Sequence, residues 1–349
     1  MIGDDLCLFD STLRDGSHAV RHQVRREWIV DYCRIIDDAG MDTVIVGHGN
    51  GLGASSIQIG LSQVPETEAL ELARQNLRKT RLGVFMLPGL GTIHDNLIPA
   101  LECGVDVVCM ACHCTEADTT RQHIEFVKSR NREAVGVLMS YHMATPEILI
   151  REARKMESYG ADRLLIMDSA GASTPEMVRS VIGGLVQALK IPVGFHAHNN
   201  LGLAVANSLL ALECGAVFLD GTVRGFGAGA GNCPLDQLTA LLQKMNARNR
   251  LSLYPMLDAG DKVVTAMAGG EYGVSSVSVV SGMAGVFSGF AEQVRSAAKN
   301  FNIDPRDIFI ELGRRKVVAG QEDIITDVAV HLAQQKQKDD TSYILESLL

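Results

Sequence analysis

Two histidines separated by one residue are the clearest chemical signal in this sequence. His196 and His198 follow the apolar run Ile191–Phe195, which predicts a buried strand. Alternate side chains of a strand share one face, so we expect the two imidazoles to lie side by side. A lone histidine on such a strand is more often a structural core residue, but a pair favours a divalent-metal site. Such a site needs a carboxylate from elsewhere in the chain.

The sequence around this pair repeats a short apolar run, a polar loop and a helical pattern. We predict eight strands, at residues 6–9, 43–46, 82–86, 105–110, 134–139, 163–167, 191–196 and 217–220. Four of the intervening helices are expected to end at a glycine, namely Gly40, Gly104, Gly160 and Gly215. Eight β/α units in about 250 residues favour a (β/α)8 TIM barrel.

A doubly wound sheet is the competing architecture, and it usually carries a G-x-G-x-x-G fingerprint. The run Gly225–Gly231 has glycine at every second position and does not match. After residue 250 the pattern becomes helical, at 256–268, 287–301, 304–312 and 322–337, while 269–285 is not assigned. We therefore predict a barrel domain, residues 1–250, and a helical C-terminal domain, residues 251–349.

Barrel enzymes place catalytic groups at the carboxyl ends of their strands. Asp15 follows the first strand, and with the two histidines it forms a two-His-one-carboxylate set that leaves metal positions open for substrate. Arg14 could pair with a substrate oxyanion, and His18 could act as a base near neutral pH. Taken singly, Asp15 could be a turn residue, Arg14 a surface charge and His18 an exposed loop histidine.

Three further polar residues follow later strands. Asp168 and Ser169 end the sixth strand, where they could bind substrate or cap the start of the following helix. Asn232 closes the glycine-rich loop after the eighth strand. It could bind the metal, could orient a metal-binding side chain through a hydrogen bond, or could simply be a turn residue.

Composition limits the class of protein. The 349 residues are 46% hydrophobic and 21% charged, as in an ordinary folded globule. A formal net charge of −9 without a basic stripe argues against nucleic-acid binding. No apolar run has membrane-spanning length, no signal-peptide pattern opens the chain, and the eight cysteines form no disulfide framework, so we expect a cytoplasmic protein.

Several motifs resemble those of one enzyme superfamily. Asp10-Ser-Thr-Leu-Arg-Asp15-Gly16, the His-x-His-Asn run at the seventh strand and Gly231-Asn232 resemble the metal-dependent pyruvate aldolases and acyl lyases, which include isopropylmalate synthase and HMG-CoA lyase. Longer stretches resemble the 4-hydroxy-2-oxovalerate aldolases, and they span nearly the whole chain: residues 13–23, 48–52, 113–118, 227–235, 311–315 and 320–323.

The resemblance implies a site and a reaction. A divalent ion, typically Mn2+ but also Co2+ or Mg2+, would be held by Asp15, His196 and His198 and would chelate a 2-oxo acid. His18 would take the proton of the 4-hydroxyl group, and Arg14 would help to stabilise the pyruvate enolate. The C-terminal domain would dock an acylating aldehyde dehydrogenase that receives the aldehyde. We also expect a homodimer or a hetero-oligomer.

Three positions depart from the family pattern. Phe287, which has no hydroxyl, stands where the family has a tyrosine near the barrel mouth, and with Ser169 it is predicted to contact substrate. Ile45 replaces a glutamate that could steady Arg14, and Asn199 replaces a histidine. The predicted metal ligands match the family pattern, while the residues expected around the substrate differ from it. We therefore predict the same bond chemistry on an aldehyde other than acetaldehyde.

Two alternatives remain open. One is a Claisen-type acyl-CoA lyase or synthase of the same superfamily, although the loop after the eighth strand lacks the cysteine of HMG-CoA lyases. The other is a catalytically impaired scaffold that keeps only the dehydrogenase-binding region. Bound metal would separate the scaffold from the enzymes.

Overall fold

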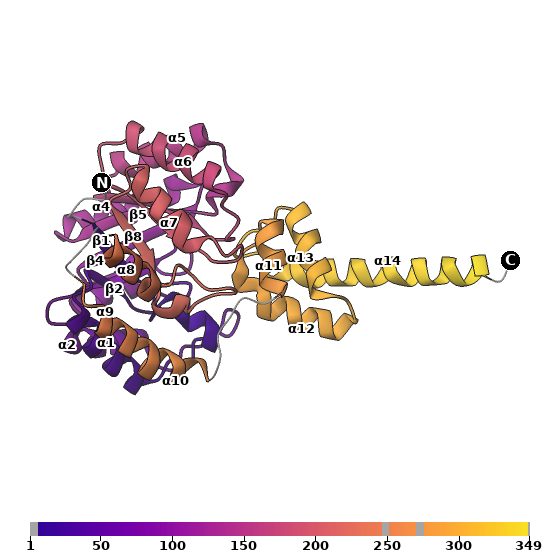
Figure 1. The fold of residues 1–349 in the computed structure, drawn as a ribbon, viewed down its shortest axis with the longest axis horizontal. Coiled ribbons are helices and arrows are strands. Elements are labelled where there is room, and N and C mark those ends of the chain that lie inside the picture. Colours follow the sequence, from indigo (N-terminus) through magenta and orange to yellow (C-terminus); the bar gives the residue numbers. More distant parts are fainter. Residues whose placement is uncertain (1–5, 246–250, 270–275, 348–349) are drawn as a thin grey trace.

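The computed structural model describes residues 6–245, 251–269 and 276–347. Eight parallel strands close into a barrel in chain order, with β8 paired to β1. They are β1 (Cys7–Asp10), β2 (Thr43–Ile45), β3 (Arg81–Met86), β4 (Val107–His113), β5 (Glu133–Met139), β6 (Arg163–Asp168), β7 (Val193–Ala197) and β8 (Phe218–Gly221). The predicted TIM barrel with a C-terminal helical region is confirmed (Figure 1).

Strand side chains alternate between two cores. One set, which includes Phe9, Ile45 and Phe85, fills the barrel interior, and their neighbours face the surrounding helices. A side chain at Gly194 would overlap the ring of Phe218, so glycine at this position makes room for that ring. The same alternation points His196 toward the barrel axis.

Helices surround this barrel and end as their sequences predict. They are α1 (Arg26–Ala39), α2 (Glu66–Asn76), α3 (Ile98–Glu102), α4 (Arg121–Ser129), α5 (Pro146–Ser158), α6 (Pro175–Ala188), α7 (Ala204–Glu213) and α8 (Leu235–Lys244). Thr145 and Thr174 cap α5 and α6 through their hydroxyls. The four predicted C-terminal glycines all have positive φ, between 76° and 100°.

The last quarter of the chain forms two groups of helices. Helices α9 (Leu253–Ala259) and α10 (Thr265–Ala268) belong to the barrel core, to which Met256 and Met267 contribute. A second core is built from α11 (Ser276–Ala284), α12 (Ala291–Phe301), α13 (Pro305–Arg314) and the first half of α14 (Asp323–Ser347). Figure 1 shows this second group on one side of the barrel, with α14 projecting away from it. The division at residue 250 stays a prediction.

Some element boundaries differ from the prediction. Strand β4 runs three residues further, so His113 ends the strand instead of following it. Helix α14 continues ten residues past Gln337, its predicted end. The unassigned stretch 269–285 contains α11, while residues 270–275 lie outside the described part. Within the described ranges, no helix is both long and apolar enough to cross a membrane.

Candidate active site

The residues predicted to bind metal meet at the carboxyl end of the barrel. The Asp15 Oδ2 atom accepts hydrogen bonds from Asn232 Nδ2 at 2.6 Å and from the Ala228 backbone N–H at 3.1 Å. The rings of His196 and His198 lie 5.1 Å apart, and His198 forms a backbone bridge to Asn232. All four side chains are almost fully buried. The fold thus brings together groups that are more than 200 residues apart in sequence.

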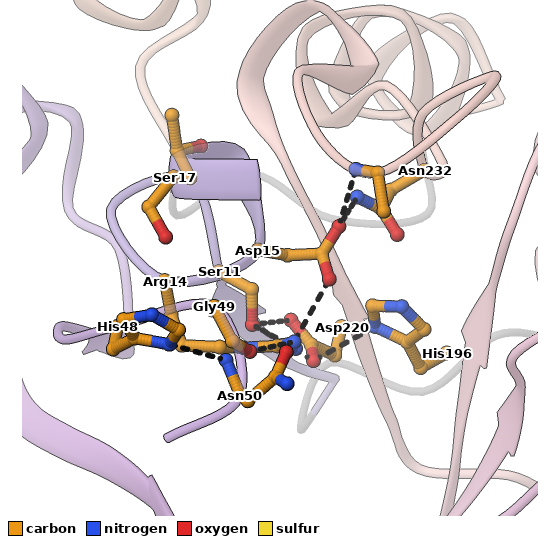
Figure 2. Close-up of polar contacts among 12 residues, drawn as sticks. Ser11, Arg14, Asp15, Ser17, His48, Gly49, Asn50, His196, Asp220 and Asn232 are labelled. Carbon is orange, nitrogen blue, oxygen red and sulfur yellow. Dashed lines mark hydrogen bonds and ion pairs between the residues drawn. The ribbon is translucent and has the colours of Figure 1, made fainter. Parts of the chain in front are cut away.

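Asp220 orients His196, a role that the sequence did not suggest. The His196 Nδ1 atom lies 2.9 Å from Asp220 Oδ2, and Ser11 donates its hydroxyl hydrogen to both oxygens of the same carboxylate. A carboxylate only accepts hydrogen bonds, so the ring proton sits on Nδ1 and the lone pair of Nε2 is free. This is the usual support of a metal-binding histidine, and Figure 2 shows the chain of contacts.

Three buried atoms near Asp15 that can offer a lone pair have no hydrogen-bond partner within the described part of the chain: His196 Nε2, His198 Nδ1 and Asn232 Oδ1. Leaving such atoms unpaired costs about 1–3 kcal/mol each, which a bound cation would offset. The donor set, with two nitrogens and oxygen atoms, suits a divalent transition metal. No cluster of three His, Cys, Asp or Glu side chains is preassembled among the described residues, so the donors would have to draw together around an ion.

Arg14 forms a buried ion pair with Asp15. Its Nη1 atom is 2.8 Å from Asp15 Oδ1, and its guanidinium carbon lies 4.6 Å from the centre of the Phe85 ring. Burial alone would raise the pKa of Asp15, but Arg14 and the nearby histidines lower it far below its usual range. Arg14 Nε is buried without a partner. Ile45 packs in the barrel interior and offers this cation no carboxylate.

His18 faces the barrel mouth on the outer side of the metal set. Its ring meets Phe287 edge to face at 6.3 Å, so the C-terminal region does reach this part of the barrel, as the sequence suggested. Burial lowers the pKa of His18, which keeps the imidazole neutral at physiological pH. His18 and Phe287 line a cavity of about 920 Å3 together with Ile57, Ile59 and residues of α12.

The other polar residues singled out in the sequence mostly stabilise loops through hydrogen bonds. Asp168 accepts hydrogen bonds from the backbone N–H groups of Ala172 and Ser173, so it stabilises the turn after β6. The Ser169 hydroxyl accepts the N–H of Ser140 at 3.1 Å. Asn199 accepts the N–H of Ala204 and so stabilises the chain entering α7. None of these contacts involves the Asp15 cluster.

Asn200 joins the barrel to the C-terminal helices. Its side-chain amide lies 2.7 Å from the hydroxyls of both Ser281 and Ser288, and it is buried. His142 adds a second link, 2.9 Å from the Gly285 carbonyl. These contacts hold the segment that carries Phe287 against the barrel mouth.

Known proteins resemble this chain over nearly its whole length. Residues 5–263 match the HMGL-like family model and residues 272–334 match the DmpG-like communication domain. The chain is 50% identical to 4-hydroxy-2-oxovalerate aldolase of Pectobacterium atrosepticum, covering 95% of this chain and 97% of the relative. It is 49% identical to 4-hydroxy-2-oxovalerate aldolase 2 of Salinispora arenicola, covering 97% of each.

Among solved structures, the carboxyl transferase domain of Rhizobium etli pyruvate carboxylase superposes with a TM-score of 0.79. The match covers 95% of this chain and 60% of that one at 16% identity, which shows a shared fold alone. The sequence relatives are much closer, and they match over nearly their full length. The chain therefore belongs to the 4-hydroxy-2-oxovalerate aldolase family, within the HMGL-like family, and is a carbon–carbon lyase.

Proposed function

We propose that this chain is a divalent-metal-dependent aldolase that cleaves or forms a 4-hydroxy-2-oxo acid, with pyruvate or another 2-oxo acid as one product. Asp15, His196 and His198 are the proposed ligands, and Asn232 is either a fourth ligand or a residue that orients Asp15. The supporting observation is the group of buried, unpartnered atoms on His196, His198 and Asn232 that surrounds one carboxylate. Mn2+ is the proposed ion, with Co2+ and Mg2+ as the alternatives.

The bound ion would supply a Lewis acid for the oxygens of the 2-oxo acid. His18 would accept the proton of the 4-hydroxyl group as the C3–C4 bond breaks and the aldehyde carbonyl forms. The bonding electrons pass to C3 and to the 2-oxo oxygen, giving an enolate. The Arg14 guanidinium is proposed to stabilise its negative charge. Protonation at C3 then gives pyruvate.

We propose that the natural aldehyde is not acetaldehyde. The supporting feature is Phe287, which places a ring without a hydroxyl beside His18. Condensation of pyruvate with a series of aldehydes would rank them by kcat/KM. Acetaldehyde as the best substrate would refute the proposal.

The C-terminal helices are the proposed docking region for an acylating aldehyde dehydrogenase in the cytoplasm. The match of residues 272–334 to a communication domain supports this partner. Co-purification of the chain with such a dehydrogenase from co-expressing cells would test the assembly. Deletion of residues 276–349 should abolish it, while a complex that persists without them would contradict it.

Deuterium exchange at C3 of pyruvate tests the metal, the base and the oxo-acid site without knowledge of the aldehyde. We expect exchange with added Mn2+, and loss of exchange after chelation or with Asp15→Asn. Full activity in stripped enzyme would refute metal dependence. A Claisen-type lyase would instead require an acyl-CoA.

A further inference from the structure

Two stacked histidines lie beside His18, and the proposed reaction uses neither of them. The rings of His22 and His48 are 3.6 Å apart and nearly parallel, and both side chains are buried. The ring of His18 meets His22 edge to face at 5.1 Å. The pair connects the 3-10 helix Asp15–Val20 and its following turn to the long loop between β2 and α2.

Backbone contacts determine which nitrogen of each ring carries the proton. The Asn50 N–H donates to His48 Nδ1 at 3.1 Å, so His48 Nε2 must donate to the Gly60 carbonyl at 3.1 Å. The Gly49 N–H points at His22 Nδ1 at 3.5 Å, and the Ser17 hydroxyl lies 3.0 Å from the same nitrogen. Both rings are therefore neutral acceptors at Nδ1.

The pKa values agree with neutral rings. Burial lowers the pKa of His22 to about 2 and that of His48 to about 4. The neighbouring His18 adds to both decreases. Neither ring would place a positive charge beside His18 at neutral pH.

The backbone of Gly49 contacts both the histidine pair and the proposed catalytic residues His18 and Arg14. A Cβ at Gly49 would overlap the His18 ring, so that ring packs directly on the Gly49 backbone. The Gly49 carbonyl accepts a long hydrogen bond of 3.4 Å from Arg14 Nη1. Figure 2 shows His48, Asn50, Gly49 and Arg14 in this sequence of contacts. One short backbone segment thus supports both His18 and Arg14.

We propose that His22 and His48 are positioning residues, which hold the Gly49–Asn50 backbone and through it set the places of His18 and Arg14. This role rests on the function proposed above. Apolar side chains could fill the same volume, but they would leave the N–H groups of Gly49 and Asn50 without an acceptor. The backbone would then shift to find new partners. Displacement of a catalytic group by about 1 Å can lower a rate by about 100-fold.

Two substitutions of His22 distinguish the loss of the hydrogen-bond acceptor at Nδ1 from the loss of the ring. His22→Phe keeps a ring but has no acceptor, and a small cavity of about 30 Å3 beside His22 and His48 gives the larger ring some room. His22→Asn keeps an acceptor close to the position of Nδ1, and asparagine tolerates the backbone φ of 63° at this site. We expect His22→Phe to lower kcat by about tenfold or more with KM and Mn2+ affinity unchanged, and His22→Asn to stay within about threefold of wild type. His48 has no positive φ, so His48→Phe should lower kcat to a similar extent without the backbone strain that a phenylalanine adds at residue 22.

A double-mutant cycle distinguishes positioning from a general loss of structure. In a His18→Gln background, His22→Phe should cause a clearly smaller further loss than in wild type, because one of the two residues it positions is already gone and only the effect through Arg14 remains. Equal losses in both backgrounds would overturn the proposal. His123→Phe is the matched control, since His123 is a partly buried histidine on α4 outside these contacts.

A second readout does not depend on turnover. Nitrogen-15 NMR of the histidine rings reports the tautomer and the environment of His18. We expect the His18 signals to move in His22→Phe and to stay near their wild-type positions in His22→Asn. Unmoved signals in His22→Phe would overturn the proposal even if no 4-hydroxy-2-oxo acid is cleaved. A wild-type enzyme that cleaves none of these acids and shows no C3 exchange would instead refute the proposed function.

Discussion

His196 and Asp220 are paired across the neighbouring strands β7 and β8, with 2.9 Å between Nδ1 and the carboxylate oxygen. Because this contact determines the tautomer, Asp220→Asn should weaken Mn2+ binding by about 10–100-fold. Activity should recover in part at saturating Mn2+. Metal titration of the stripped protein measures the effect. Ser11→Ala, which removes a donor to Asp220 and a long contact of 3.4 Å from Arg14 Nη2, should cause a smaller loss. An unchanged Mn2+ affinity in Asp220→Asn would contradict the assignment.

Asn200 should couple the C-terminal helices to the barrel mouth. Asn200→Ala removes the hydrogen bonds between its side-chain amide and the buried hydroxyls of Ser281 and Ser288, a cost of about 1–3 kcal/mol. We expect faster hydrogen exchange in α12 and a higher KM for the aldehyde, with Mn2+ affinity unchanged. Asn199→Ala is the neighbouring control because its side chain contacts only the start of α7. Equal exchange rates in the two variants would contradict the coupling.

Phe287→Tyr restores the hydroxyl at the position where the family has a tyrosine. If the natural aldehyde has an apolar chain, the added hydroxyl must lose water when the substrate binds, and kcat/KM should fall by about tenfold. Acetaldehyde leaves that hydroxyl hydrated, so its kcat/KM should fall less. The measurement is the ratio of kcat/KM for the natural aldehyde to kcat/KM for acetaldehyde. A ratio equal to that of wild type would show that Phe287 does not select the aldehyde.

The metal-free protein should lose stability as the pH falls from 6.5 to about 4. Burial lowers the pKa of His22, His48 and His198 to about 2, 4 and 3, so these groups stay neutral when folded but bind protons once unfolded. Burial raises the pKa of Asp10 to about 6, which acts in the opposite direction. The pKa values of Glu66 and Asp168 are raised as well, and those of His18, His113, His123 and His142 are lowered. The histidines with a lowered pKa therefore outnumber the carboxyls with a raised pKa, and each net proton is worth about 1.4 kcal/mol per pH unit.

Urea unfolding at pH 7, 6 and 5 would measure this dependence. His48→Asn removes one of the three histidines and should make the loss of stability per pH unit smaller. A free energy of unfolding that rises on acidification would mean that the buried histidines are protonated in the folded state.

The barrel was predictable because its signals are local. Strand runs, threonine caps and C-terminal glycines each depend on a few adjacent residues, and Thr145, Thr174 and Gly40 all do what their positions suggest. The metal set was also accessible, since the carboxyl ends of all barrel strands meet at one rim. Whether Asp15, His196 and His198 bind an ion stays a prediction.

The supporting residues were not predictable because they depend on register between distant strands. In the sequence, Asp220 is an ordinary residue of the eighth strand. Only the register between β7 and β8 places it opposite His196. The stacking of His22 on His48 likewise requires the path of two loops. The packing of α9 on the barrel follows from tertiary contacts that no helical pattern reveals.

The place of Phe287 in the chain has a consequence for synthesis on the ribosome. Every side chain proposed to hold the ion lies before residue 233, and the barrel core is complete by α10. The ring beside His18 is translated later and belongs to a separate core. Because domains fold as units from the N-terminus, the nascent chain can form the proposed metal-binding rim before the ring of Phe287 reaches His18.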